Sequence, residues 1–446
     1  MEFESQQYHH PKLVLHFDVN ETILCDDPAA GDSFEECLNK IICKSAFVKK
    51  VHGELPEVWL DGSPIDGEHP PPLCTTWVWP EGTVPYYHAS DAARSQAKTF
   101  TEDGSPGAAY RPVFEKLKEA LRWPNQKPGQ DGEAALPDSR LCRDGHHFLI
   151  PAFFKTICEL ANRGRSFSIV IRTFGTDIND VAAALQAFSE GAHLSEFVPV
   201  VPEMSLMTSD HTDGGEQTYT VWNGSYDRDT GTFRLHQQGG ESIDNENDLV
   251  ELLHAPQKNI NCVACTDDYE WWKRHGYAPS AGKPVWLDYV ERPYDILPIF
   301  FDDNIHNDSE DSIVAVRSKV IRVQQKDIYR AGAGKTNDGS PGSESSSSKG
   351  SSFHRGKIRK VQQRYLDQAE DGKTSGCSNN DSASSGSSNG SRFRPLSGTE
   401  TLLEHGIHLV KVPTIEPILN PMWFIEQIDK CEQAWRQRLA TATTRK

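Results

Sequence analysis

The sequence predicts an α/β protein with a doubly wound, Rossmann-like parallel sheet, into which a cap region and a disordered Ser-rich segment are inserted. Three observations lead to this prediction. Apolar runs without alternation, such as residues 12–17, are typical of strands buried on both faces. Helix-like segments separate these runs, and repeated strand–helix–strand order implies right-handed crossovers in a parallel sheet. Several runs end abruptly in polar residues, at the sheet edge where such folds bind ligands.

The first predicted strand, "KLVLHFD", ends at Asp18, with Asn20 and Thr22 following at alternate positions. A carboxylate at the carboxyl end of a buried strand is a candidate for chemistry, because ligands of open α/β sheets bind there. The first piece of the core is therefore assigned to residues 12–24. Residues 25–147 are assigned to a cap-like insertion, since a crossover needs far fewer residues.

The cap-like insertion contains two amphipathic helix patterns, over residues 32–50 and 108–123, and the aromatic stretch "PPPLCTTWVWPEGTVPYYH". Such aromatic residues fill a core more often than they form a platform for a ligand. A second insertion, over residues 201–260, contains a predicted β-hairpin that turns at "DRDTG". Either insertion can select a substrate, but the sequence of neither indicates which substrate.

The core is predicted to resume over residues 148–330. Its second strand ends at Thr173, and a helix then begins at Thr176 or Asp177 and ends at Gly191.

A third apolar strand, "DILPIFF", runs into Asp302 and Asp303, and "SIVAVR" is the fourth predicted strand. Lys283 precedes the acidic pair and can reach the same edge. Because parallel strands place their carboxyl ends side by side, Asp18, Thr173 and the acidic pair are expected to converge. Three carboxylates repel one another unless a hard cation neutralises them, and oxygen ligands without His or Cys suit Mg²⁺. A hydroxyl and an ammonium beside that ion suit phosphate oxygens.

These motifs resemble the haloacid dehalogenase superfamily. Its motifs are Asp-x-Asp-x-Thr after a strand, a Ser or Thr after the next strand, a Lys, and an acidic pair, and their counterparts occur here in that order between residues 12 and 320. The resemblance implies that Asp18 is the nucleophile that accepts a phosphoryl group, and that Thr173 and Lys283 bind its oxygens. It also implies Mg²⁺ as cofactor, with four ligands: Asp18, the backbone carbonyl of Asn20, Asp302 and Asp303.

The chain departs from the family's phosphatases at Asn20, where they have an Asp that acts as general acid and base. An amide cannot titrate, and losing such help costs about 100- to 10,000-fold in rate. The backbone carbonyl can still bind the metal. Turnover is therefore expected to be slow unless the leaving group departs without a proton.

Each residue also has a plainer interpretation. Asp18 can be a turn or cap residue, Thr173 can satisfy a neighbouring amide, Lys283 can lie in a solvated loop, and the acidic pair can be a surface turn. Three hypotheses follow: a slow Mg²⁺-dependent phosphohydrolase or phosphotransferase, a binding or regulatory protein with impaired catalysis on the same fold, or a Rossmann-like body without a Mg²⁺ site. The expected partner is a phosphorylated small molecule or a phosphoprotein.

Charge and composition argue against nucleic-acid-binding and membrane-spanning proteins. The formal net charge of -18 argues against nucleic acid as a partner. No run of about 20 apolar residues occurs and the N-terminus is polar, so we expect no membrane span, no signal peptide and a cytoplasmic location. The CxxC of Cys262 and Cys265 falls in an apolar strand, where residues three apart face opposite ways and cannot share a metal.

The region after the core divides into two parts. Residues 331–397 are rich in Ser, Gly and Asn and are expected to be disordered, because they can bury little apolar surface. Residues 401–440 are expected to form a strand and an amphipathic helix, over 415–438, that pack back onto the core.

Overall fold

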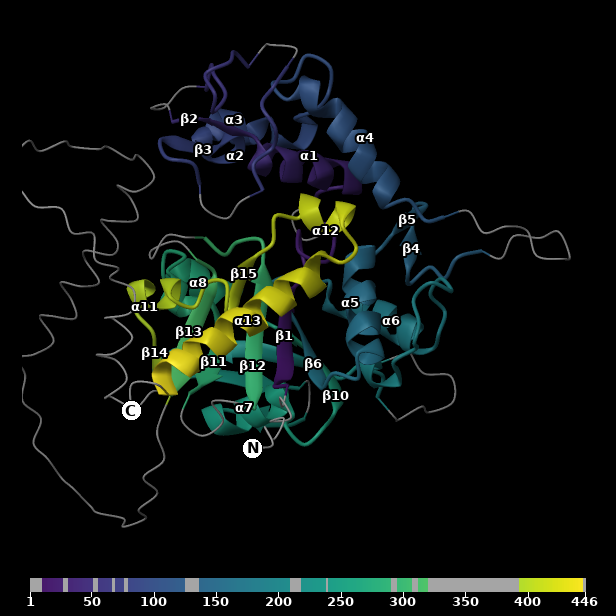
Figure 1. The fold of residues 1–446 in the computed structure, drawn as a ribbon, viewed down its shortest axis with the longest axis vertical. Coiled ribbons are helices and arrows are strands. Elements are labelled where there is room, and N and C mark those ends of the chain that lie inside the picture. Colours follow the sequence, from purple (N-terminus) through teal and green to yellow (C-terminus); the bar gives the residue numbers. More distant parts are fainter. Residues whose placement is uncertain are drawn as a thin grey trace, which may run out of the picture.

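A computed structural model of the chain describes residues 10–26, 31–50, 55–65, 69–75, 79–124, 136–208, 218–237, 240–289, 295–306, 312–319 and 393–443. These residues form a mixed α/β fold around an eight-stranded, mainly parallel sheet (Figure 1). The predicted α/β class is confirmed at this level.

The large sheet has the strand order β15-β12-β1-β6-β10-β7-β8-β9. Its strands are β1 (Lys12–Asp18), β6 (Phe167–Thr173), β7 (Val221–Tyr226), β8 (Phe233–His236), β9 (Ser242–Ile243), β10 (Ile260–Thr266), β12 (Ile296–Asp302) and β15 (Leu409–Lys411). Neighbours from β15 to β7 pair in parallel. β7 and β8 form an antiparallel hairpin across the "DRDTG" turn, and β9 extends it.

Apolar side chains cover both faces of this sheet. Leu13, Leu15 and Phe17 of β1 belong to one core cluster, whereas Val14 belongs to another. Successive side chains of a strand point to opposite faces, so the two clusters lie on opposite sides. The unbroken apolar run of β1 is explained by this double burial. Cys262 packs on the first cluster and Cys265 belongs to the second, which confirms that they do not face the same way.

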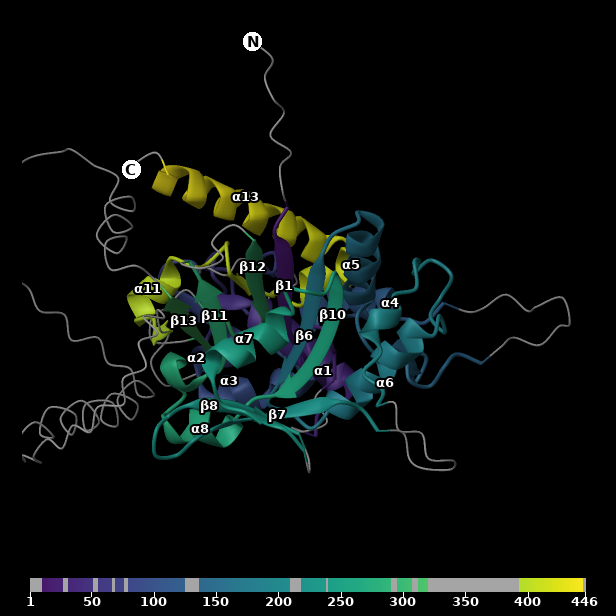
Figure 2. The same cartoon turned by 90° about the horizontal axis from the view of Figure 1, so that it is seen from below.

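Helices lie on each side of the sheet. The first cluster contains residues of α5 (Pro151–Asn162), α6 (Ile178–Ser189), α12 (Ile415–Leu419) and α13 (Trp423–Thr443). The second contains residues of α7 (Glu246–His254). Figure 2 shows α13 and α7 on opposite sides of the central strands. Asp177 is the residue before α6, as expected, and Gly191 follows its end with a positive φ of 77°.

The segment between β1 and α5, here called the inserted segment, gathers beyond the carboxyl end of β1 (Figure 1). Its described elements are α1 (Phe34–Ser45), β2 (Phe47–Lys49), β3 (Thr83–Pro85), α2 (Tyr86–Ala89), α3 (Asp91–Ser95), α4 (Arg111–Ala120), β4 (Cys142–Arg143), β5 (His146–His147) and two 3₁₀ turns, Ala97–Thr99 and Ala108–Tyr110. A capping box of Ser33 and Glu36 begins α1. Both expected amphipathic helices are present, as α1 and α4.

A second sheet of three strands stands beside the large one. β11 (Lys283–Asp288) and β13 (Val314–Lys319) pair in parallel, and β14 (Arg394–Pro395) pairs antiparallel with β13. The strand predicted at "SIVAVR" exists as β13, but its expected place in the large sheet is wrong. Short elements that complete the fold are α8 (Tyr269–Arg274), α11 (Gly398–Leu402) and 3₁₀ turns at Pro202–Met204 and Pro279–Ala281.

Most of the Ser-rich segment predicted to be disordered, residues 331–392, lies outside the described residues. Its last five residues do not fit the prediction, because residues 393–397 contain β14 and Ser397, whose side chain caps α11. Phe393 is buried in the second core cluster. An aromatic anchor and a cap therefore order this end of the segment.

The C-terminal strand and helix pack on the core as expected. β15 pairs with β12, and α13 contacts α5 and β12. The single helix predicted over 415–438 is wrong, because Asn420 adopts an extended backbone that separates α12 from α13. The physical reason is Pro421, since a residue before proline is disfavoured in the helical conformation.

Candidate functional site

Four of the sequence-predicted side chains lie at or beside the carboxyl ends of three adjacent strands. Asp18 ends β1, Thr173 ends β6 and Asp302 ends β12, with Asp303 directly after it. Asp18, Asp302 and Asp303 are buried, and each offers a carboxylate oxygen within 4.8 Å of the others. This is the only such group of potential metal ligands in the described part of the chain. The three acids therefore form one cluster, here called the acidic triad.

Lys283 reaches the acidic triad from the second sheet. It is the first residue of β11 and is 1% exposed, so the plainer interpretation as a solvated lysine does not hold. Its Nζ donates to Oδ1 of Asp18, and to Oδ2 of Asp302 at 2.8 Å. One ammonium group thus bridges the ends of β1 and β12.

Thr22 links Asp18 to Asp303 within the acidic triad. Its Oγ1 donates to Oδ2 of Asp18 at 3.3 Å and accepts the backbone N–H of Asp303 at 3.1 Å. Asn304 donates its backbone N–H to Asp302 at 2.8 Å and its side-chain amide to Asp303 at 2.9 Å. The interpretation of the acidic pair as an exposed surface turn is excluded by this burial and bonding.

Thr173 and Asn20 lie next to each other on the other side of Asp18's strand. Thr173 Oγ1 accepts the backbone N–H of Gly175 at 2.8 Å and donates to Oδ1 of Asn20 at 3.4 Å. Asn20 donates its amide to Oδ2 of Asp177 and to the backbone oxygen of Asp26, both at 3.2 Å. Both ends of the Asn20 amide are therefore engaged.

Burial raises the pKa of two acids of the triad. Desolvation raises the pKa of Asp18 well above its usual range, although Lys283 opposes the shift. Desolvation, with the charges of Glu21 and Asp302, raises the pKa of Asp303 to about 6 despite Lys44. Buried carboxylate oxygens gathered in this way are the ligands that a hard divalent cation such as Mg²⁺ takes.

Three side chains near the site were missed by the sequence reasoning. Lys44 of α1 pairs with Glu21 and lies 3.2 Å from Oδ2 of Asp303. Asp177 was considered only as a helix cap, yet it holds the amide of Asn20. Glu21 had one signal in the sequence, since it lies between Asn20 and Thr22. Lys44 had none, because no sequence pattern links it to Asp303, which lies 259 residues later.

Comparison of the chain with models of known families, with curated proteins and with solved structures finds no match. None of the helices in the described ranges combines the length and the apolar character needed to cross a membrane.

Proposed function

We propose that this chain is a Mg²⁺-dependent phosphohydrolase or phosphotransferase of the haloacid dehalogenase type. The observation that carries the proposal is the acidic triad at the strand ends, bridged by Lys283 and flanked by Thr173. On this proposal the large sheet and its helices are a doubly wound, Rossmann-like core, and the inserted segment is its cap. The substrate is a phosphorylated small molecule or a phosphoprotein.

The proposed roles follow from the contacts. Mg²⁺ would be held by Asp18, the backbone carbonyl of Asn20, Asp302 and Asp303, and would offset the charge of the phosphoryl group. Asp18 is the proposed nucleophile, since an aspartate can form a covalent phosphoryl intermediate. Lys283 orients that carboxylate and offers its positive charge to the phosphoryl oxygens. Thr173 supplies a hydroxyl to the same oxygens.

The position of Asn20 limits the reaction. Its amide donates to Asp177 and accepts from Thr173, and it has no proton to give at neutral pH. The leaving group must then depart as an anion, which favours esters of acidic alcohols or phenols.

Hydrolysis of 4-nitrophenyl phosphate with and without Mg²⁺ tests the proposal. We expect Mg²⁺-dependent release of 4-nitrophenol, loss of it in Asp18→Asn, and a phosphoryl group on Asp18 after acid quenching, detected by mass spectrometry. Asp229→Asn is the matched control, because Asp229 is an exposed acid on the β7–β8 turn.

The second candidate is a binding or regulatory protein on the same fold, and the specific observation in its favour is again the amide of Asn20. It predicts that Mg²⁺ binds, that Asp18→Asn weakens this binding, and that no phosphate is released from any ester. That combination would refute the enzyme proposal.

A further inference from the structure

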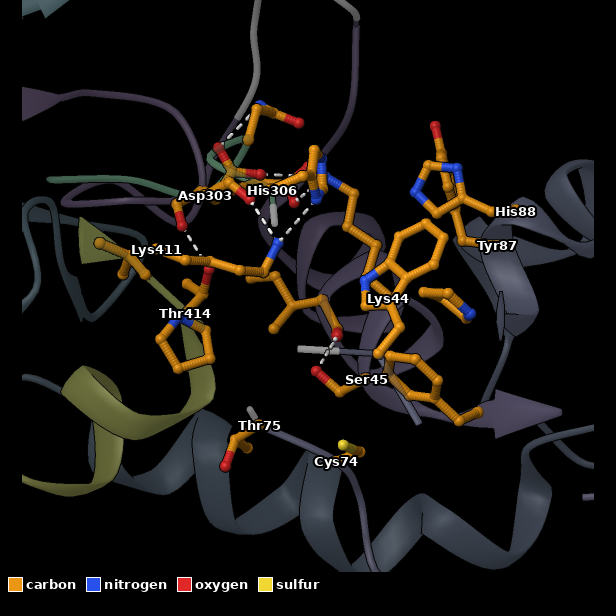
Figure 3. A pocket seen from close by; sticks show the side chains of 18 residues that line it. Lys44, Ser45, Cys74, Thr75, Tyr87, His88, Asp303, His306, Lys411 and Thr414 are labelled. Atoms are coloured by element: carbon orange, nitrogen blue, oxygen red, sulfur yellow. Dashed lines mark hydrogen bonds and ion pairs between the residues drawn. The ribbon is translucent and has the colours of Figure 1, made fainter. Parts of the chain in front are cut away.

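A cavity of about 160 Å³ lies next to the acidic triad, between the inserted segment and β15 (Figure 3). Asp303 lines it from the triad's side, Lys44 and Tyr87 from the inserted segment, and Lys411 from the end of β15. The leaving group of a substrate cleaved at the triad would enter this cavity first.

Aromatic rings form one wall of the cavity. The Trp79 ring lies 5.7 Å from that of His88 and 5.8 Å from that of His306, between ring centroids. Tyr87 contacts His88 at 5.1 Å. Burial lowers the pKa of His88 to about 3 and that of His306 well below its usual value, so both imidazoles are neutral at pH 7. The wall is therefore uncharged and suited to a ring.

Two ammonium groups lie between this wall and the triad. Lys44 Nζ is 3.2 Å from Oδ2 of Asp303 and 5.5 Å from the centroid of the Tyr87 ring. Lys411 Nζ donates to the backbone oxygen of Asp303 at 2.9 Å and lies 3.5 Å from Nδ1 of His306. An anion that moves from the triad toward the rings would pass both groups.

The volume of the cavity limits what it can hold. A protein cavity of about 150 Å³ accepts benzene, and this one is of similar size. It is large enough for a single six-membered ring.

We propose that this cavity receives the leaving group of the substrate and that the substrates are phosphate monoesters of single-ring phenols. The inference rests on the proposed phosphatase function. In the reaction, an oxygen of Asp18 forms a bond to phosphorus while the bond from phosphorus to the phenolic oxygen breaks. The electron pair stays on that oxygen as a phenolate, which needs no proton from residue 20. Lys44 and Lys411 stabilise the phenolate, which takes a proton from water after release.

The test compares phenyl phosphate with acetyl phosphate, because both have good leaving groups and only one has a ring. In Trp79→Leu we expect KM for phenyl phosphate to rise about 10-fold, the value of one lost ring contact with its burial. KM for acetyl phosphate should stay within about twofold of the wild type. Trp271→Leu is the matched control, since Trp271 is a half-buried tryptophan of α8 away from the cavity. If Trp79→Leu does not fold, His88→Leu replaces it with the same expectation.

Binding of 4-nitrophenol, followed by its absorbance, tests the cavity without turnover. If 4-nitrophenol binds more weakly to Trp79→Leu but not to Trp271→Leu, the cavity is supported as a ring site. This holds even if the protein hydrolyses no ester, a result that would refute the phosphatase proposal. The inference is overturned, while the phosphatase proposal stands, if three results are found together. Both phosphates are hydrolysed, Trp79→Leu changes KM for both equally, and 4-nitrophenol does not bind.

Discussion

Asn20 is the residue on which the proposed chemistry depends most. A carboxylate in its place would face Asp177, because the Asn20 amide nitrogen lies 3.2 Å from Oδ2 of that acid. Two carboxylates at that distance repel each other unless they share a proton. Placing an acid at position 20 therefore requires a change at both positions.

The first prediction concerns this pair. In Asn20→Asp/Asp177→Asn, which exchanges the two side chains, we expect hydrolysis of an alkyl phosphate such as glycerol 3-phosphate to rise by about 100-fold or more, because acid–base help provides about 100- to 10,000-fold. Hydrolysis of phenyl phosphate should change much less, since its leaving group needs no proton. Steady-state rates on both esters measure the contrast.

Two further variants serve as controls for that exchange. The single variant Asn20→Asp is expected to gain less and to unfold at a lower urea concentration, because of the repulsion from Asp177. Equal gains on both esters in the exchanged variant would show that water attack on the phosphoenzyme, and not departure of the leaving group, limits the rate.

At the scale of elements, the loop between β6 and α6 passes very close to the site. A Cβ atom on Gly175 would lie 2.6 Å from Oδ2 of Asp177 and 3.3 Å from Oγ1 of Thr173. Real Cβ contacts are essentially never that short, so Gly175 permits the close approach of this loop to both side chains.

The second prediction is that Gly175→Ala lowers kcat/KM for phenyl phosphate by about 10-fold or more, because the added Cβ displaces the Asp177 carboxylate and crowds the hydroxyl of Thr173. Thermal unfolding, followed by circular dichroism, should show a smaller decrease in melting temperature than a core substitution causes. Gly240→Ala is the control, since the nearest atom to its added Cβ is 3.5 Å away. Unchanged kinetics in Gly175→Ala would argue against a role for Thr173.

β11 carries Lys283 yet belongs to a separate sheet, so its position depends on side chains. Arg172 of β6 pairs with Asp267 and donates to the backbone oxygen of Pro284 in β11 at 2.9 Å. Arg172 and Asp267 are each buried. This ion pair therefore ties β11, and with it Lys283, to the large sheet.

The third prediction is that Asp267→Asn lowers the free energy of unfolding by about 3–5 kcal/mol, the cost of leaving one member of a buried pair without its partner. Urea unfolding measures it. Glu115→Gln, which removes the exposed partner of Arg111 on α4, should cost less than about 0.5 kcal/mol. Equal losses in the two variants would show that the buried pair is not a structural tie.

For the whole molecule, the acidic triad makes stability depend on pH and, on the proposed function, on Mg²⁺. The pKa of Asp303 in the folded protein is raised to about 6 from 3.8. Between these values the folded state binds more protons than the unfolded state, so stability falls as pH rises through this window. On the proposed function, Mg²⁺ would bind the ionised folded state and oppose that loss.

The fourth prediction is that, without divalent cations, the wild type loses about 2 kcal/mol more than Asp303→Asn between pH 4 and pH 6.5, at about 1.4 kcal/mol per unit of pKa shift. Millimolar Mg²⁺ at pH 6.5 should restore wild-type stability and leave Asp303→Asn less affected. Urea midpoints at several pH values measure both effects. If the stability of the two proteins changed with pH in the same way, Asp303 would not be the group that titrates in this window.

The features that depend on local pattern could be predicted from the amino-acid sequence alone. The apolar runs of β1, β6 and β12, and the polar residue at the end of each, could be read directly, because burial on both faces selects such runs. The common edge for Asp18, Thr173 and Asp302 followed from parallel pairing. The α/β class rests on the same signals.

Which distant groups meet at that edge depends on how the whole chain folds. Lys44 and Asp303 are 259 residues apart, and no periodicity links them. Likewise, the pattern of "SIVAVR" is that of a buried strand whichever sheet it joins, so its pairing with β11 could not be predicted. Local patterns specify which face of an element is buried, whereas the partner of that face is set by packing of the whole chain.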